Sequence, residues 1–534
     1  MKFSLKQMHF NQILGILGIL EKSSDIIIFR CFLTFLYRKQ RKIIVFFAVF
    51  LYYLNMINES FIGRNKEIQQ LQNCVNSKQS QLLIVYGRRR VGKSYLINQF
   101  FEDNFDFKLV GDLQLNKEGQ LLNFYNELKR KTGKDEPIPK NWREAFWQLR
   151  DYLDAFKDEK KHIVFFDEMP WLDNQKSDFL PAFEYFWNSF GAAKNNLMFI
   201  VCGSATSWLV DKIDHNKGGL YNRQNLRMYI EPFSLHEVEE FLIKKKNINW
   251  NRYDICECYM ILGGIPFYLD LLDRNLTCSQ NIDNLFFVKH ASLWDEFNHL
   301  YKTLFNNSEK YIKVIETISS KRIGLSRKEI VSQTKMSDNS ELTKILKNLT
   351  DSGFLRAYSF FGKKKQGTFY QLSDYFTAFY LKFVKDYNGK NPDFWAHNIE
   401  NSARKAWAGL TFEQLCKDHI KQIKHKLSIA GIYSEESAWY TKADYVHDGA
   451  QIDMLIDRRD RIIDVCEMKF SEKPFSIDKA YDMALRNKMG IFKTVTKTTK
   501  AVQLIMITTF GVAQNMYSNI MQAEVTADDL FVEY

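Results

Sequence analysis

The sequence predicts an α/β protein whose main domain is a parallel sheet flanked by helices. The first observation is an apolar run, Gln81–Tyr86, that leads directly into a glycine-rich loop and an amphipathic helix. The second is another apolar run, His162–Phe166, which ends in two carboxylates. The third is a pair of strand-like segments near the C-terminus, Gln451–Ile456 and Arg461–Lys469, joined by a short polar turn. Strands separated by helices favour a parallel sheet, and the terminal hairpin adds an antiparallel pair of strands.

Composition places the chain among ordinary globular proteins. Its 534 residues are enough for three or four domains, and 46% of them are hydrophobic while 26% are charged. Aromatic residues at 15% exclude a disordered chain, because disordered segments lack the large side chains that build a core. The eight cysteines show neither a disulfide framework nor zinc-type spacing, so we expect reduced thiols and a cytoplasmic protein.

The net charge of +11 is concentrated in two blocks. Residues 1–57 carry eight basic and two acidic side chains, and residues 302–370 carry fourteen basic and six acidic ones. The rest of the chain is slightly acidic, so the overall charge says little about partners by itself. Each basic block therefore has to be interpreted from its own sequence.

The first basic block, residues 1–57, contains several apolar stretches. The last of them, Ile43–Leu54, is twelve residues long, which is shorter than the roughly 20 residues that a membrane-spanning helix needs. It also begins too late for a signal peptide. One interpretation is a membrane anchor flanked by basic residues. We favour a peripheral segment, or a chain whose translation begins at Met56.

Residues 87–94 form the strongest motif of the chain, a G-x-x-x-x-G-K-S loop between a strand and a helix. The glycines let backbone N–H groups point at phosphate oxygens, and the helix N-terminus adds its partial positive charge. We expect Lys93 to bridge the β- and γ-phosphates of ATP and Ser94 to ligate Mg²⁺. The alternative, a chance match on a surface loop, does not explain the order of strand, loop and helix. The residues expected to bind the nucleotide are Gly87, Arg88, Arg89, Arg90, Val91, Gly92, Lys93, Ser94 and Tyr95.

Two later strands end in polar residues that suit the same site. Asp167 and Glu168 follow the second apolar run, and we assign Asp167 to the metal ion and Glu168 to the water that attacks the γ-phosphate. The next strand, Leu197–Cys202, is followed by Ser204, which either senses the γ-phosphate or caps the next helix. These residues predict ATP hydrolysis.

The motifs closely resemble those of the archaeal-type AAA ATPases, within the STAND-like P-loop NTPases. Besides the loop and the acids, the resemblance rests on Phe61-Ile62-Gly63-Arg64, Glu231-Pro232-Phe233-Ser234 and Gly263-Gly264-Ile265-Pro266. It implies a P-loop ATPase domain over residues 58–230 and a helical lid over residues 231–301.

The resemblance also implies roles for residues outside the loop. Phe61, Ile62 and Arg64 would lie near adenine, and Pro266 would belong to the lid close to the nucleotide. The family usually has Gly-Arg where this chain has Asn222-Arg223. Arg223 is therefore a candidate finger or sensor arginine, and a surface salt bridge is its alternative role.

Residues 302–372 predict a winged helix. Ser326–Glu329 is a capping box that begins a second helix, Ser340 begins a third, and two strand-like segments flank the basic tip Gly362–Gly367. The local charge favours DNA binding, whereas a structural adaptor, such as a lid or a dimer surface, is the alternative. The lysines expected to contact phosphates are Lys344, Lys347, Lys363, Lys364 and Lys365.

The C-terminal hairpin carries two acids and a lysine in the order that a nuclease requires. Glu467 and Lys469 share one face of their strand because side chains alternate, and Asp453 lies opposite them across the hairpin. Two acids that hold Mg²⁺ and a lysine that positions water would permit hydrolysis of a phosphodiester. Glu413, on an upstream amphipathic helix, is a further candidate ligand of the same metal. The alternative is a solvated cross-strand ion pair.

The order of these residues is similar to that in the PD-(D/E)xK nuclease-like domain at the C-terminus of this ATPase family. The resemblance implies a restriction-nuclease-like fold over residues 373–534. It implies the fold more firmly than cleavage, because many members of that superfamily have lost activity.

The sequence thus predicts a Mg²⁺-dependent ATPase in which ATP controls a winged helix and access of nucleic acid to a nuclease-like domain. One alternative is a nucleotide-switched regulatory or scaffold protein with an inactive C-terminal domain. Another is a membrane-tethered ATPase that acts on proteins. A homo-oligomer is compatible with each of these.

Overall fold

The structure is a computed structural model that describes residues 61–174, 177–204, 208, 223–305, 307–362, 367–443 and 449–533. The chain divides into two units, Met1–Asn65 and Lys66–Tyr534. The expectations for residues 1–57 lie outside the described residues. Within the described ranges, no helix combines the length and the apolar character needed to cross a bilayer.

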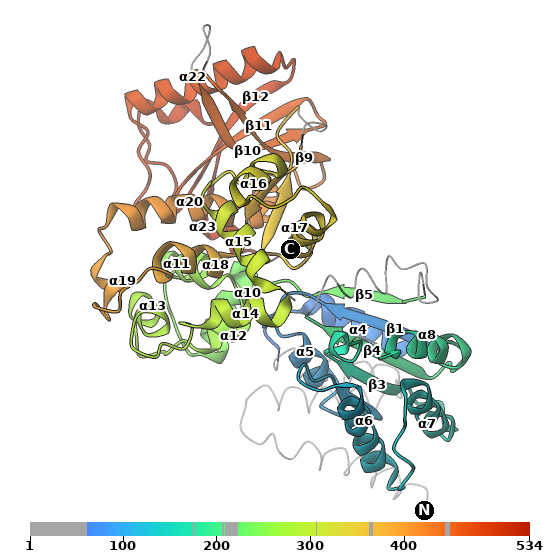
Figure 1. The fold of residues 1–534 in the computed structure, drawn as a ribbon. Helices are drawn as coiled ribbons and strands as arrows, with labels where there is room; N and C mark the ends of the chain where they lie inside the picture. The colour runs from blue at the N-terminus through green and yellow to red at the C-terminus, as the bar shows by residue number, and fades with distance from the viewer. Residues whose placement is uncertain are drawn as a thin grey trace, which may run out of the picture. The chain divides into compact units, whose positions relative to one another are not determined.

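The second unit begins with a parallel sheet (Figure 1). Within the described residues this sheet has five strands in the order β2-β3-β4-β1-β5, each parallel to its neighbours. The strands are β1 (Gln81–Tyr86), β2 (Phe107–Val110), β3 (His162–Asp167), β4 (Leu197–Gly203) and β5 (Leu226–Tyr229). The helices of this region are α4 (Asn65–Asn76), α5 (Lys93–Phe100), α6 (Lys117–Thr132), α7 (Trp142–Asp154) and α8 (Phe179–Ser189). The predicted α/β class is confirmed.

One face of this sheet packs on α6, α7 and α8 through a core rich in aromatic side chains. Phe146 of α7 lies 5.1 Å from Phe186 of α8 and 6.0 Å from Phe166 of β3, measured between ring centroids. The inner strands β1, β3 and β4 are largely apolar runs because the middle of a parallel sheet is buried on both faces. The sheet is therefore a rigid support for the loops at its ends.

Parallel pairing gathers the carboxyl ends of β1, β3 and β4 at one edge of the sheet. Tyr86 pairs with Gly203, and Phe166 pairs with Val201. The glycine-rich loop, Asp167 and Ser204 follow these positions directly, so the polar residues predicted to share a site lie at the same edge.

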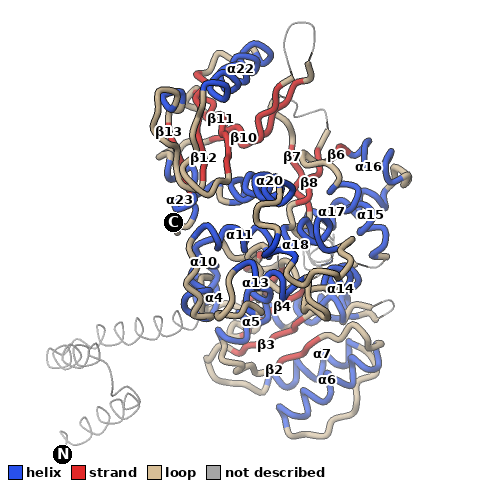
Figure 2. The backbone as a smooth tube through the Cα atoms, turned by 90° about the vertical axis from the view of Figure 1, so that its left-hand side faces the viewer, coloured by secondary structure: helices blue, strands red, loops and turns tan. Residues whose placement is uncertain are grey.

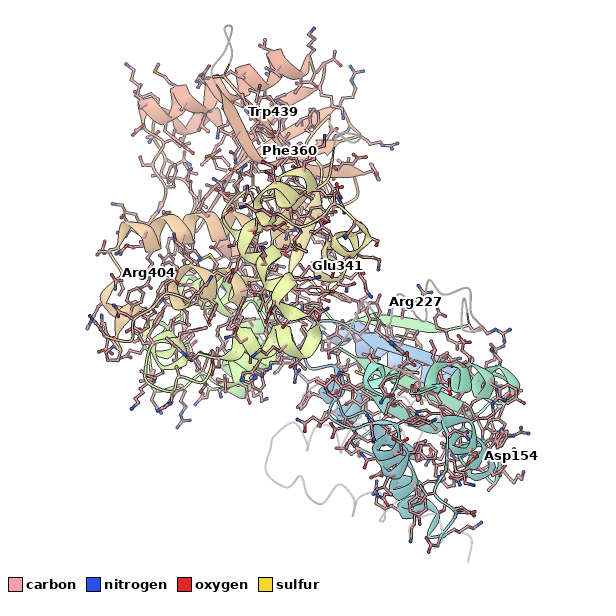
Figure 3. The ribbon with its side chains drawn as sticks, viewed as in Figure 1. Asp154, Arg227, Glu341, Phe360, Arg404 and Trp439 are labelled. Carbon is pink, nitrogen blue, oxygen red and sulfur yellow. The ribbon has the colours of Figure 1, made fainter. Side chains whose placement is uncertain are left out.

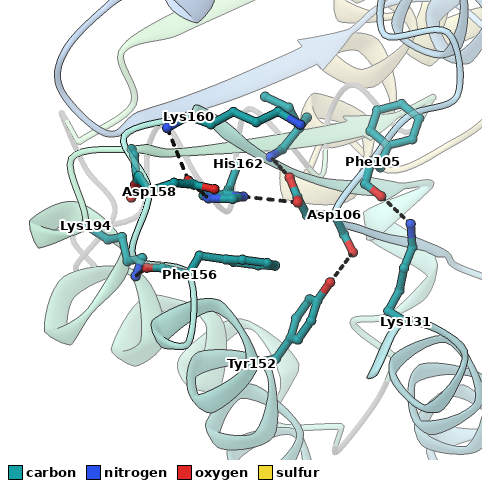
Figure 4. Close-up of polar contacts among 11 residues, drawn as sticks. Phe105, Asp106, Lys131, Tyr152, Phe156, Asp158, Lys160, His162 and Lys194 are labelled. Atoms are coloured by element: carbon teal, nitrogen blue, oxygen red, sulfur yellow. Dashed lines mark hydrogen bonds and ion pairs between the residues drawn. The ribbon is translucent and has the colours of Figure 1, made fainter. Parts of the chain in front are cut away.

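The amino end of β3 is held by a separate polar network (Figure 4). The His162 ring lies between two carboxylates, with Nε2 at 2.8 Å from Asp158 and Nδ1 at 3.1 Å from Asp106. The backbone N–H of Ile163 donates to Asp106 at 2.8 Å, and the His162 ring stacks on Phe156. These contacts fix β3 at the end opposite Asp167, so their role is structural.

A helical region follows the sheet. Ser234 and Thr277 begin two of its helices with capping boxes, in which the third helical residue bonds back to the capping residue. The helices are α10 (Leu235–Glu240), which continues into a π-helical turn (Phe241–Lys245), α11 (Arg252–Leu262), α12 (Pro266–Asp270), α13 (Cys278–Phe286) and α14 (Glu296–Leu304).

The next segment has three helices and a small antiparallel sheet of strand order β6-β8-β7 within its described residues. Ser326 and Glu329 form the predicted capping box, and α17 begins at Ser340 as predicted, with Asn339 as its N-cap. The elements are α15 (Ser308–Ser319), β6 (Leu325–Ser326), α16 (Arg327–Thr334), α17 (Ser340–Asp351), β7 (Leu355–Tyr358) and β8 (Phe369–Leu372).

The C-terminal segment contains a second sheet of five strands in the order β13-β12-β11-β10-β9, counted within the described residues (Figure 2). Strands β9, β10 and β11 are antiparallel, as the predicted hairpin requires, whereas β12 and β13 run parallel to β11. The strands are β9 (Ser434–Thr441), β10 (Ala450–Arg458), β11 (Ile462–Lys469), β12 (Ala501–Thr508) and β13 (Ala523–Thr526). The helices are α18 (Tyr375–Phe379), which continues into a π-helical turn (Tyr380–Val384), α19 (Phe394–His397), α20 (Ser402–Asp418), α21 (Ile420–Lys426), α22 (Lys479–Thr496) and α23 (Ala527–Leu530).

The segments of the second unit contact one another through buried groups. Phe360 forms a β-bridge with Ala438 of β9 and lies beside Trp439 in Figure 3. Arg404 of α20 is buried against Glu257 of α11, with Nε donating to the carboxylate at 3.1 Å. The C-terminal segment thus packs on both the helical region and the segment of α15–β8.

Candidate functional site

The glycine-rich loop leaves β1 at Gly87 and enters α5 at Gly92. Gly87 has φ of 146°, and an added Cβ would lie 2.4 Å from the Ile230 carbonyl oxygen. Gly92 has φ of 89°, which side chains rarely tolerate. Lys93 is buried, and its Nζ reaches back to donate to the Arg88 carbonyl at 2.9 Å. The loop therefore curls around its own lysine.

Polar side chains from β3 and β4 meet the start of α5. Ser94 Oγ donates to Asp167 at 2.9 Å. Glu168 has φ of 46° and turns its carboxylate to Ser204, accepting from Ser204 Oγ at 3.0 Å and from its backbone N–H at 3.1 Å. The structure thus brings Lys93, Ser94, Asp167, Glu168 and Ser204 together. A hydroxyl beside a carboxylate offers the hard oxygen ligands that Mg²⁺ prefers, so Ser94 and Asp167 fit such an ion.

The loop arginines reach away from the sheet. Arg88 forms two hydrogen bonds to Asp374, the N-cap of α18, one of them from Nη2 at 3.1 Å. Burial lowers the pKa of Arg88, but the Asp374 carboxylate outweighs this effect and the pKa is raised. Arg90 pairs with Glu296 of α14 at 2.6 Å and lies over the Phe267 ring at 4.1 Å. For Arg89, the buried Nη1 has no hydrogen-bond acceptor within the described part of the chain.

The other residues predicted to contact the nucleotide come from separate parts of the chain. Tyr95 is exposed on the first turn of α5, and Pro266 is the first residue of α12. Arg223 is exposed, and it has no ion-pair partner among the residues that the structure describes. Phe61, Ile62 and Arg64 belong to the first unit, in which Arg64 has φ of 62°.

The C-terminal acids are paired with basic side chains of the protein itself. Arg322, in the turn between α15 and β6, contacts Glu413 of α20 and pairs with Asp453 of β10 at 2.6 Å. Burial and the nearby Asp453 carboxylate raise the pKa of Glu413 to about 7, although Arg322 opposes them. One guanidinium therefore lies against both acids.

Glu467 has a different set of partners. It accepts a hydrogen bond from Tyr481 at 2.6 Å and pairs with Lys488 at 2.8 Å, both on α22, and with Lys469 at 3.0 Å. Burial would raise its pKa, but the two lysines and these hydrogen bonds lower the pKa to about 2. Among the described residues, no three His, Cys, Asp or Glu side chains are close enough together to hold a metal. The structure thus joins Glu413 with Asp453 and Glu467 with Lys469, but does not gather the three acids.

The two described lysines among those predicted to contact DNA lie on α17. Lys344 is exposed on α17, and Lys347 on the same helix pairs with Asp351 at 2.7 Å. Lys363, Lys364 and Lys365 lie outside the described residues.

Sequence reasoning missed the partners that come from distant segments, namely Asp374, Glu296, Arg322, Tyr481 and Lys488. Asp374 is separated from Arg88 by 286 positions, and no local pattern connects them. The Ser373-Asp374 pair before an aromatic helix is typical of an N-cap, which was the one available signal for Asp374.

A curled G-x-x-x-x-G-K-S loop between a strand and a helix of a parallel sheet, with an acid at the end of a nearby strand, defines a P-loop ATPase. A model of the ATPase domain found predominantly in Archaea matches residues 61–272. An uncharacterised ATP-binding protein of Methanocaldococcus jannaschii is 44% identical over 43 residues, which are 8% of this chain and 73% of that protein. The chain belongs to this family of archaeal ATPases.

Two further similarities cover a larger share of the chain. An uncharacterised protein of Methanocaldococcus jannaschii is 25% identical over 445 residues, which cover 80% of this chain and 92% of that protein. The solved structure of a Walker-type ATPase of Pyrococcus abyssi is 20% identical with a TM-score of 0.45, and the match covers 61% of this chain and 97% of that one.

Proposed function

We propose that residues 58–230 bind ATP with Mg²⁺ and hydrolyse it, and that residues 231–301 form a lid over the nucleotide. The observation that carries this proposal is the junction of the loop with β3, where Ser94, the residue after the buried Lys93, donates a hydrogen bond to Asp167. The matched relative whose name describes it as ATP-binding supports the choice of nucleotide.

Each residue of this group has a distinct proposed role. Lys93 would exchange the Arg88 carbonyl for the β- and γ-phosphates, because a phosphate is the stronger acceptor for an ammonium group. Ser94 and Asp167 would hold Mg²⁺, which neutralises charge on the phosphates. Glu168 would orient the attacking water while Ser204 holds its carboxylate in place.

The family resemblance supports further contacts to the nucleotide. Phe61, Ile62 and Arg64 would contact adenine, and Pro266 would approach from the lid. Arg223, which is exposed, would contact the γ-phosphate of a nucleotide held in this chain or in a second copy.

Titration of ATP into the full chain in a calorimeter tests this site. Wild type is expected to bind, and Lys93→Ala is expected to lose binding because the buried cation that faces the phosphates is gone. Lys129→Ala is a matched control, because Lys129 of α6 pairs with the exposed Asp135. Equal binding by wild type and Lys93→Ala would refute the site.

We further propose that residues 302–372 form a winged helix that binds DNA, and that residues 373–534 form a nuclease-like domain. Three helices with a small antiparallel sheet support the first assignment. The hairpin that carries Asp453, Glu467 and Lys469 supports the second. With Glu413 and Asp453 bound to Arg322, the arrangement does not fit a metal ion, so Arg322 would have to withdraw before the domain could act.

A nucleotide-switched regulator with an inactive C-terminal domain is the second candidate function. The observation that favours it is that each acid already has a basic partner within the chain. Mg²⁺-dependent cleavage of DNA, with and without ATP, distinguishes the two functions. Cleavage that is lost in Asp453→Ala supports the nuclease, and equal cleavage by both proteins, or none, supports the regulator.

A variant of Arg322 provides a second way to distinguish the nuclease from the inactive regulator. If the acids form a cation site, Arg322→Gln should bind Mn²⁺ at least tenfold more tightly than wild type, because two carboxylates lose their internal cation. Arg356→Gln is the matched control, since Arg356 lies in the same segment and pairs with Asp418 instead.

A further inference from the structure

We propose that Asp374 is a positioning residue for the phosphate-binding loop, and that the Arg88–Asp374 ion pair couples the nucleotide site to the start of α18. This inference rests on the proposed binding of ATP at residues 87–94. It extends that proposal to a residue far outside the ATPase domain.

The ion pair is built to fix the conformation of Arg88. The guanidinium meets the carboxylate with two nearly parallel hydrogen bonds, Nη1 to Oδ1 and Nη2 to Oδ2. The side chains are only 5% and 1% exposed, so water cannot replace either partner. Arg88 also lies 5.2 Å from the centre of the Phe354 ring. A buried bidentate pair of this kind holds its arginine in one geometry.

The backbone of Arg88 belongs to the phosphate-binding loop. Its carbonyl is the acceptor for Lys93 Nζ at 2.9 Å. A change in the position of Arg88 therefore moves the group that holds the catalytic lysine. Within the described part of the chain, Asp374 reaches the loop through this pair, so it acts on the lysine through Arg88.

On its other side, Asp374 is part of α18. Its Oδ2 accepts a hydrogen bond from the Thr377 N–H at 2.9 Å, which satisfies a free N–H of the first helical turn. Tyr375 of the same helix contacts Asp418 of α20, the helix that also carries Glu413. Asp374 is thus shared between the loop and the segment that carries the second candidate site.

Coupling through such a shared residue is reciprocal. If the pair favours the loop conformation that binds ATP, then ATP must favour the pair and the capped form of α18 by the same factor. The two effects can be measured separately, one as ATP affinity and the other as hydrogen exchange in α18.

The first test is calorimetric titration of the full-length protein with ATP. Asp374→Asn keeps the helix cap and the size of the side chain but removes the charge, and we expect ATP to bind about tenfold more weakly. Asp283→Asn is the matched control, because Asp283 is equally buried and caps α19 through Trp395 and Ala396 without contacting the loop. Its ATP affinity should stay within twofold of wild type. Asp374→Glu, which retains the charge, should recover part of the affinity.

A double-variant cycle separates positioning from a general loss of structure. Arg88→Gln and Asp374→Asn should each weaken ATP binding, and the double variant should be no weaker than the worse single variant, because both remove the same pair. If the two losses of ATP affinity multiply in the double variant, or if Asp374→Asn binds ATP normally, the inference is overturned. If wild type itself fails to bind ATP, the proposed function fails instead.

The second test uses wild type alone and does not depend on a variant that folds. Hydrogen exchange at residues 375–379 is followed with and without a slowly hydrolysed ATP analogue. Slower exchange with the nucleotide supports the coupling. An unchanged rate, under conditions where calorimetry shows the analogue bound, contradicts it.

Discussion

Ser204 contacts Glu168, the proposed general base, and its role can be tested separately from that of Glu168. Its hydroxyl and backbone N–H both donate to Glu168, which sits in a left-handed conformation at the end of β3. A carboxylate held by two donors has few orientations open to it, so Ser204 prepares Glu168 for the water.

Replacing this serine should therefore lower turnover more than binding. We expect Ser204→Ala to reduce kcat several-fold, which is less than the roughly 10²–10⁴-fold that a general base itself contributes, with little change in ATP affinity. Ser204→Thr, which keeps the hydroxyl, should retain most activity. Steady-state ATP hydrolysis measures both, and a Ser204→Ala enzyme with wild-type kcat would contradict the role.

His419 provides a prediction about acidity and stability. It is buried, with Nε2 accepting from the Leu235 N–H at 3.1 Å and Nδ1 donating to the Leu415 carbonyl at 2.9 Å. Burial lowers its pKa, despite the nearby Asp418 carboxylate. The folded protein therefore keeps the ring neutral at a pH where the unfolded chain takes up a proton.

The direction of the pH dependence of stability follows from this difference in protonation. The contribution of neutral His419 to the free energy of unfolding is fully present above its ordinary pKa of about 6.5. It falls as the pH drops from there toward the lower pKa of the folded protein, by up to about 1.4 kcal/mol per pH unit. Thermal unfolding at pH 7.5 and pH 5.5 should show a smaller drop for His419→Gln, which can replace both hydrogen bonds, than for wild type. Equal drops would show that another group is responsible.

At the scale of elements, the aromatic core between β3, α7 and α8 supports the sheet whose carboxyl end carries the proposed nucleotide site. Phe146 is 2% exposed and contacts rings from all three elements. Its neighbour Trp147 lies on the outer face of α7 and is 49% exposed. The two adjacent aromatic residues thus allow a comparison of buried and exposed positions on one helix.

Phe146→Ala should destabilise the protein by about 3–5 kcal/mol, because it removes a buried ring and leaves a cavity. Trp147→Ala should cost less than about 1 kcal/mol, since about half of that side chain already meets water. Denaturant unfolding of the two variants measures the difference. Similar losses in both would mean that the α7 interface is not a packed core.

At the scale of the whole molecule, local patterns predicted more of the fold than of the contacts between segments. The strands that lead to Gly87 and Asp167 were predictable because buried parallel strands are continuous apolar runs. The Ser326 capping box and the hairpin of β10 and β11 were predictable because their signals span a few residues. The junction of Lys93, Ser94 and Asp167 followed from the rule that strand ends meet at one edge.

The C-terminal site could be predicted only in part. Alternation along β11 places Glu467 and Lys469 on one face, and they do pair. The basic partners that come from other segments are Lys488 of α22, which pairs with Glu467, and Arg322 of the turn before β6, which pairs with Glu413 and Asp453. Such pairs depend on how separate segments pack, and no local sequence pattern encodes that packing.

The most direct test of the account is single-turnover and steady-state hydrolysis of ATP by wild type and Glu168→Gln, with Mg²⁺ present. Because Glu168 is assigned to the water and not to the nucleotide, the variant should bind ATP with wild-type affinity and release phosphate at least about 10²-fold more slowly. Phosphate release at the wild-type rate by Glu168→Gln would contradict the assignment of this edge of the sheet as the hydrolytic site.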